Sequence, residues 1–229
     1  MVKVDQAVIA RIEKNGNKFE ILVDPNLAMD LKHGKDVNFD ELLPLYTIYK
    51  DSRAGEEQIQ EKIKEAFKTD DIKVIVKKII QDGEIQLTTE QRRKFQENKR
   101  LEIISFISKN AINPQTKLPH PPIRIENAIE QAKIHIDPFK SSTEQIPKIV
   151  DALKKILPIS LEKVHFAVKI PAIYVGHAVG VIHKFEIKKE QYQTNGDLLV
   201  EFELPAGLKQ DLITKLNSLT HGQVDVKIV

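Results

Sequence analysis

The 229-residue chain contains no cysteine, and this absence excludes disulfide bonds, iron–sulfur clusters, cysteine-ligated zinc and a thiol nucleophile. It also lacks any apolar run near the roughly 20 residues that a helix needs to cross a bilayer. Its N-terminus has neither the basic nor the apolar region of a signal peptide. These absences predict a protein without membrane association, and the cytoplasm is its expected location.

Glycine is scarce, with nine residues, and no segment has the glycine-rich pattern that cradles a phosphate. Most of the nine fall where turns or helix ends are expected. Gly176 and Gly180 instead stand within a predicted helix, and their four-residue spacing indicates close packing against a neighbouring element. We therefore expect no nucleotide hydrolysis by this chain.

Groups for acid–base or metal chemistry are also few. The seven histidines show no metal-ligand spacing. His177 and His183, for example, are six residues apart on one predicted helix and so point to different sides. Adjacent acids fall at predicted helix starts, where the helix dipole accounts for them without catalysis. The sequence therefore predicts no catalytic residue, no metal site and no cofactor.

What the chain does contain is typical of a folded protein, since 41% of its residues are hydrophobic and 30% are charged. The charge is unevenly distributed. Lysine and arginine number 14 against 17 acids over residues 1–86, 13 against 8 over 87–159, and 8 against 8 over 160–229. The basic middle third indicates an anionic partner, although an ordinary solvated surface explains the surplus equally well.

The first third of the chain mixes strand and helix signals. Two β-prone runs flank Asn15-Gly16, a dipeptide that accepts the positive φ of a tight hairpin turn. Thr69 suits the cap of a later helix that Gly83 ends. The expected elements are strands over 6–12 and 18–23, a helix over 25–34, a strand over 45–50, a loop over 52–55, a helix over 56–67 and a helix over 70–83.

The middle third predicts a bundle of three helices. Thr88 and Gln91 form a capping box that begins a helix over 89–110, of which only the second half is apolar enough to be well buried. A proline-stiffened loop leads to a helix over 123–136. A third helix runs over 142–157, with a capping box between Ser142 and Gln145. Each helix is apolar on one side, and short connections let three such helices pack together.

The last third shows the order strand, helix, strand, strand, helix, strand, which is that of a ferredoxin-like sandwich. The predicted fold class is therefore α+β with three domains: a mixed α/β domain over 1–87, a three-helix bundle over 88–159 and a ferredoxin-like domain over 160–229. Breaks in the residue pattern at Thr88 and at 158–160 predict that the domains move as semi-independent bodies.

Two groups of basic residues are candidates for binding phosphates. One group lies on the first, polar half of the helix over 89–110 and consists of Arg92, Arg93, Lys94, Lys99 and Arg100. An exposed helix made soluble by mixed charge is the alternative explanation for it. The other group lies on and beside the stiff proline loop, which presents donors at small entropic cost, and consists of Lys109, Lys117, His120 and Arg124.

Five separated segments carry distinctive residue combinations. They are Arg11 with the run over 16–21, the runs over 66–71 and 79–86, the proline-rich segment over 113–128 and Leu-Pro-Ala-Gly over 204–207. Together they resemble the Shwachman-Bodian-Diamond syndrome (SBDS) family of ribosome maturation factors. The chain resembles a short, archaeal-type member of that family that ends at its last strand.

The resemblance implies the same three domains, with an N-terminal fold of the FYSH type, and a non-enzymatic monomer that binds the large ribosomal subunit and its rRNA late in maturation. It also implies cooperation with an elongation-factor-like GTPase to remove the anti-association initiation factor six. The N-terminal domain is expected near the peptidyl-transferase centre, with rRNA contacts through Arg11, Lys14, Lys18 and Arg53. The other expected RNA-binding residues are Arg92, Arg93, Lys117 and Arg124.

Two other functions remain open on the sequence. One is a general RNA-binding protein that acts in RNA processing, and the other is an enzyme whose site is assembled between domains. A ribosome factor should prefer intact large subunits, a general binder should accept any RNA, and an enzyme should do neither.

Overall fold

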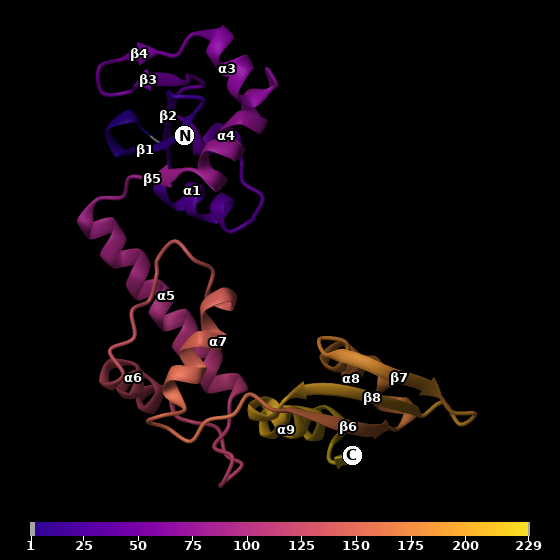
Figure 1. Ribbon diagram of the computed structural model, residues 1–229. Helices are drawn as coiled ribbons and strands as arrows, with labels where there is room; N and C mark the ends of the chain where they lie inside the picture. Colours follow the sequence, from indigo (N-terminus) through magenta and orange to yellow (C-terminus); the bar gives the residue numbers. More distant parts are fainter. Residues whose placement is uncertain (1–2, 229) are drawn as a thin grey trace. The chain divides into compact units, whose positions relative to one another are not determined.

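The computed structural model describes residues 3–228 (Figure 1). Their contacts group into two compact units. One holds the residues up to Lys99 together with Asp137–Ser141, and the other holds Arg100–Ile136 and the residues from Ser142 onward. Helices and two antiparallel sheets make the chain an α+β protein, as predicted. The domain boundaries at 87–88 and 159–160 stay a prediction.

Five antiparallel strands form the sheet of the N-terminal domain, in the order β4-β3-β2-β1-β5. β1 and β2 make the predicted hairpin, and Asn15 and Gly16 at its turn have φ values of 51° and 71°. β5 reaches the edge of this sheet from far along the sequence and pairs with β1 at Ala10 and Arg11. The strands are β1 (Val8–Lys14), β2 (Asn17–Val23), β3 (Tyr49–Asp51), β4 (Glu56–Glu57) and β5 (Glu84–Ile85).

Four α-helices complete this domain: α1 (Pro25–Lys32), α2 (Phe39–Leu42), α3 (Gln60–Phe67) and α4 (Ile72–Asp82), after a short 3₁₀ helix over Val4–Gln6. Buried apolar residues of the sheet and of the helices form one core. At its centre the rings of Phe19 and Phe67 meet edge to face with centroids 5.0 Å apart. The predicted helix over 25–34 is thus α1, with Gly34 just beyond its end at a φ of 84°.

Three local predictions for this domain are wrong, each at the end of an element. The helix expected from residue 56 begins at Gln60, because Glu56–Glu57 pair with β3 as a strand. The strand expected over 45–50 is confined to Tyr49–Asp51, where the partner strands lie beside it. The cap of α4 is Asp71, whose carboxylate accepts a helix N–H at 2.9 Å, whereas the Thr69 hydroxyl accepts from the Asp71 amide.

The predicted bundle consists of α5 (Thr89–Asn110), α6 (Pro122–Gln131) and α7 (Ser142–Leu153). The capping box that begins α5 is confirmed. The Thr88 amide donates to Gln91 Oε1 at 2.9 Å, and the Gln91 amide donates to Thr88 Oγ1 at 3.1 Å. The second half of α5 supplies its buried residues to the bundle core, again as predicted.

The other two bundle helices are shorter than predicted. α6 ends at Gln131, because Lys133 adopts a left-handed φ of 50° that a helix cannot contain. α7 ends at Leu153, where the chain tightens into turns over 154–156. Ser142 is itself the first residue of α7, and its buried hydroxyl makes no hydrogen bond with any residue that the structure describes, so the predicted capping box with Gln145 is wrong.

The C-terminal domain has the predicted ferredoxin-like fold. Its antiparallel sheet has the order β7-β8-β6-β9, and alternate residues of the two central strands face the helices and form the core. Phe166 and Phe202 stack there with ring centroids 6.0 Å apart. The elements are β6 (Lys163–Ile170), α8 (Val175–Ile182), β7 (Glu186–Tyr192), β8 (Leu198–Pro205), α9 (Lys209–Thr220) and β9 (Asp225–Ile228), with 3₁₀ turns over Ala172–Tyr174 and Ala206–Leu208.

The close packing expected at Gly176 and Gly180 is wrong. A Cβ atom added at either glycine would meet no heavy atom of residues 3–228 within 4 Å. The reason is that α8 packs through its other side, where Ala178 and Ile182 are fully buried. The two glycines therefore lie on the solvent-facing side of α8.

Candidate nucleic-acid interface

An open groove of 640 Å³ lies on the N-terminal domain at the edge of its sheet. Its walls come from β1, from the start of β2 and from the corner at which α4 turns into β5. Two of the predicted RNA-binding residues, Arg11 and Lys18, lie together in this groove. The lining residues are Arg11, Ile12, Glu13, Lys18, Asp82, Gly83 and Glu84.

Arg11 is held by two partners on the neighbouring edge of the sheet. Its Nη2 and Nε atoms donate to Oε2 of Glu84 at 2.9 and 3.2 Å. With its amide oxygen turned toward Arg11, Gln86 accepts from Nη1 at 2.8 Å and from Nε at 3.1 Å. The guanidinium therefore has a defined orientation although its side chain is 45% exposed.

The corner that carries Glu84 is fixed by the backbone of Gly83. A Cβ atom at this position would lie 2.3 Å from the carbonyl oxygens of both Arg11 and Ile79, so only glycine allows the approach. Lys32 of α1 adds three hydrogen bonds, from Nζ to the carbonyl oxygens of residues 80, 81 and 83 at 2.9, 3.2 and 2.8 Å. Burial lowers the pKa of Lys32, an effect that the nearby Asp82 carboxylate opposes.

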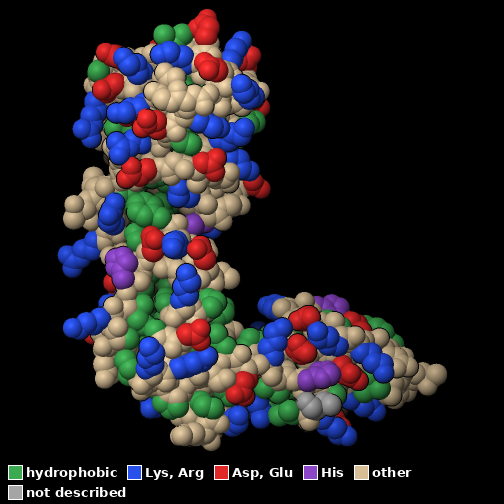
Figure 2. Space-filling model, in the orientation of Figure 1, with side chains coloured by type: hydrophobic (Ala, Val, Ile, Leu, Met, Phe, Trp, Pro, Cys, Tyr) green, Lys and Arg blue, Asp and Glu red, His purple; other side chains and the backbone are tan. Residues whose placement is uncertain are grey.

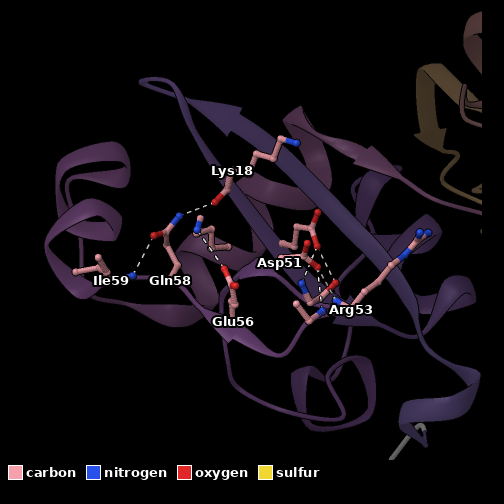
Figure 3. Close-up of polar contacts among 10 residues, drawn as sticks. Lys18, Asp51, Arg53, Glu56, Gln58 and Ile59 are labelled. Carbon is pink, nitrogen blue, oxygen red and sulfur yellow. Dashed lines mark hydrogen bonds and ion pairs between the residues drawn. The ribbon is translucent and has the colours of Figure 1, made fainter.

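Lys14 and Arg53 lie elsewhere on the same domain. Lys14 ends β1, and its Nζ lies 5.3 Å from the centre of the Phe67 ring, as in a cation–π contact. Arg53 stands in the loop between β3 and β4, where Asp51 Oδ1 accepts from the Arg53 amide at 3.0 Å (Figure 3). The Arg53 side chain extends from this loop and is exposed.

No sequence motif singles out Gln58, which lies beside Lys18 of the groove. It is 6% exposed, donates to the carbonyl oxygen of Lys18 at 2.7 Å and accepts from the Ile59 amide at 3.0 Å (Figure 3). It thus joins the first residues of β2 to the start of α3. A buried glutamine with both ends bonded fixes the backbone that carries Lys18.

The predicted basic residues of α5 have different surroundings. The guanidinium carbon of Arg92 lies 5.5 Å from the centre of the Phe139 ring. Phe139 belongs to the same compact unit, and its carbonyl oxygen lies 3.1 Å from Nε2 of His33. Arg93 is exposed to solvent. Arg92 therefore has a packing role in addition to any contact with phosphate. Arg93 is exposed and available for a contact with phosphate.

The stiff loop between α5 and α6 presents some of its polar residues and buries one. Lys117 adopts a left-handed φ of 57°, and its Nζ lies 3.3 Å from Oε2 of Glu162. Hydrogen bonds from Ser160 and then from Lys117 lower the pKa of Glu162. Arg124 is exposed on α6. These two predicted residues belong to the second compact unit.

His120 of this loop does not present a donor to a ligand, contrary to expectation. Its side chain is almost fully buried, and its Nε2 lies 2.9 Å from the carbonyl oxygen of Pro158. The carbonyl oxygen of His120 in turn accepts from Ser108 Oγ at 2.9 Å. The buried ring attaches the loop to the bundle. The side chains of its apolar neighbours Leu118 and Ile123 are exposed to solvent.

The groove has a mixed charge. Arg11 and Lys18 face the carboxylates of Glu13, Asp82 and Glu84 along its lining. Figure 2 likewise shows acidic and basic side chains interspersed over the face of the N-terminal domain in view. Such a surface lacks the strong positive potential that attracts any polyanion, so phosphate binding there depends on shape and on defined contacts.

Within residues 3–228, no group of three or more histidine, aspartate or glutamate side chains could hold a metal ion. Over the same part of the chain, no helix is both long and apolar enough to cross a membrane.

Comparisons with known proteins cover the chain from near its start to its end. Three family models match it in succession: the Shwachman-Bodian-Diamond syndrome (SBDS) N-terminal domain over residues 6–93, SBDS protein domain II over 101–162 and the SBDS protein C-terminal domain over 164–229. The first of these matches contains the groove.

Several curated proteins are similar to the chain. It is 42% identical over 231 residues to the ribosome maturation protein SDO1 homolog of Methanothermobacter thermautotrophicus, covering 100% of both chains. It is 38% identical to the protein of the same name from Aeropyrum pernix, over 100% of this chain and 98% of that one. With the ribosome maturation protein SBDS of Gallus gallus the identity is 27%, over 73% of this chain and 66% of that one.

Proposed function

The chain belongs to the SBDS family, and on this premise we propose that it is an archaeal ribosome maturation factor that binds the rRNA of the large ribosomal subunit. The observation that carries the proposal is the similarity over the full length to two archaeal proteins named for ribosome maturation. The groove supports it, because it places Arg11 and Lys18 together on an exposed edge of the N-terminal domain.

We also propose partners and a location for the factor. In the cytoplasm the factor acts as a monomer with an elongation-factor-like GTPase and promotes release of the anti-association initiation factor six from the large subunit. The protein contributes differential binding: it occupies an rRNA surface and favours the state of the partner from which the factor leaves. Lys14, Arg53, Arg92, Arg93, Lys117 and Arg124 are proposed as further RNA contacts.

Sedimentation with purified ribosomal subunits tests the proposal. We expect the protein to pellet with large subunits at physiological salt and to remain in the supernatant with small subunits. Protein-free rRNA of the large subunit is the matched control, because it has the same RNA sequence but lacks the assembled surface of the subunit. Equal binding to both subunits and to free rRNA would instead assign a general RNA-binding function, and binding to none would reject both.

We also propose that the chain has no enzymatic activity of its own. It has no glycine-rich phosphate loop followed by lysine and serine or threonine, and its described acidic residues form no cluster for magnesium. We therefore expect no GTP or ATP turnover by the purified protein, with or without ribosomal subunits, when the GTPase is absent. Turnover that co-purifies with the chain and is lost when its own residues are mutated would contradict this expectation.

A further inference from the structure

We propose that Glu84 determines the RNA selectivity of the groove by holding Arg11. The carboxylate of Glu84 weakens the attraction of Arg11 for loosely bound RNA. It also occupies one edge of the guanidinium, so that a phosphate can bind only at the other edge. This inference rests on the proposed RNA-binding function and adds to it a residue that suppresses binding to the wrong RNA.

Arg11 has more hydrogen-bond donors than its two protein partners use. A guanidinium has five N–H groups. Glu84 accepts from Nε and Nη2, and Gln86 accepts from Nη1 and shares Nε. One N–H on Nη1 and one on Nη2 remain, and they can bind a phosphate as a pair. The two protein acceptors therefore decide which edge of Arg11 an RNA can reach.

Three carboxylates line the groove around Arg11. Glu84 lies in direct contact with Arg11, and Glu13 and Asp82 line the same groove. An unstructured RNA that reaches Arg11 through one phosphate meets three carboxylates there. A folded rRNA surface that contacts Arg11, Lys18 and residues outside the groove together gains enough contacts to outweigh this repulsion. Selectivity then follows from the repulsive groups as much as from the attractive ones.

The backbone of Glu84 is held in place opposite Arg11. It follows Gly83, whose backbone lies against the carbonyl of Arg11, and the three hydrogen bonds from Lys32 hold the same corner. Glu84 also pairs with Arg11 across the β1–β5 ladder. An exposed ion pair between two mobile side chains has little effect, but here the backbones of both partners are fixed in register.

The test compares two variants that remove the same charge from the same groove. Glu84→Gln removes the carboxylate that contacts Arg11. Glu13→Gln is the matched control, because Glu13 lines the groove but forms no ion pair with Arg11 among the described residues. Binding is measured to a short uridine homopolymer and to purified large subunits, each at low and at physiological salt. Thermal unfolding of both variants checks that the fold is retained.

We expect Glu84→Gln to raise the affinity for the homopolymer about fivefold over wild type, and Glu13→Gln to raise it by less than half as much. The affinity of Glu84→Gln for large subunits should not rise. The ratio of its affinity for large subunits to its affinity for the homopolymer should therefore be lower than in the wild type. In an Arg11→Lys background, which keeps the charge but removes the planar fork, the effect of Glu84→Gln should fall to that of Glu13→Gln, because only the general loss of one carboxylate from the groove then remains.

The inference is overturned if Glu84→Gln and Glu13→Gln change the affinity ratio equally, or if the effect of Glu84→Gln persists at its full size with Arg11→Lys. In both cases binding of the wild type to large subunits would leave the proposed function standing. Failure of the proposed function has a different signature, which is wild-type protein that does not sediment with large subunits at all.

Discussion

The double variant Arg11→Glu, Lys18→Glu should lose large-subunit binding by roughly 10- to 100-fold at physiological salt while it keeps its fold. Both side chains are exposed, so their replacement leaves the buried core intact. Each substitution replaces a cation that can contact phosphate with an anion that repels it. We also expect a flatter dependence of binding on salt, since fewer counterions are released from the RNA.

The matched control for this variant is Lys68→Glu, Lys77→Glu. These two lysines are exposed on the same domain but do not line the groove, and the change in net charge is identical. The control should bind large subunits within about threefold of wild type, because only long-range electrostatics change. Unchanged sedimentation of the Arg11 and Lys18 variant, or an equal loss in both variants, would show that the groove is not the rRNA contact.

The Gly83→Ala variant should lower the free energy of unfolding of the N-terminal domain by about 3 kcal/mol. The new Cβ would lie 2.3 Å from two backbone carbonyl oxygens, which no side-chain rotation can relieve. The corner must therefore shift, and with it the β1–β5 pairing and the hydrogen bonds from Lys32. Because Glu84 follows directly, the hold on Arg11 should weaken as well.

Hydrogen exchange of the β1 and β2 amides under native conditions measures this effect within the N-terminal domain, whatever the other domains do. Gly180→Ala is the control, since that glycine lies in a helix with open space around it. It should leave these amides unchanged and stabilise the C-terminal domain by up to about 1 kcal/mol. Wild-type exchange rates in Gly83→Ala would mean that the close approach at Gly83 is not needed.

Features that depend on near neighbours in the chain could be predicted from the residue types alone. Asn15-Gly16 predicts the first hairpin because these two residue types tolerate positive φ, and Thr88 with Gln91 predicts the start of α5 because the two groups satisfy each other's hydrogen bonds. The ferredoxin-like order follows from alternation of apolar residues. The basic candidates were found by residue type, and their role in binding RNA stays a prediction.

Contacts between distant segments of the folded chain determine which of these residues lie together and which are buried. Arg11 and Glu84 are 73 residues apart, and β5, which brings them together, is too short to leave a periodic signal. The burial of His120 and the exposure of Gly176 depend on which elements, distant in sequence, pack beside them. No local sequence pattern contains that information. Hydrogen-bonding and φ preferences act between neighbours in sequence, whereas burial and charge pairing act between neighbours in space.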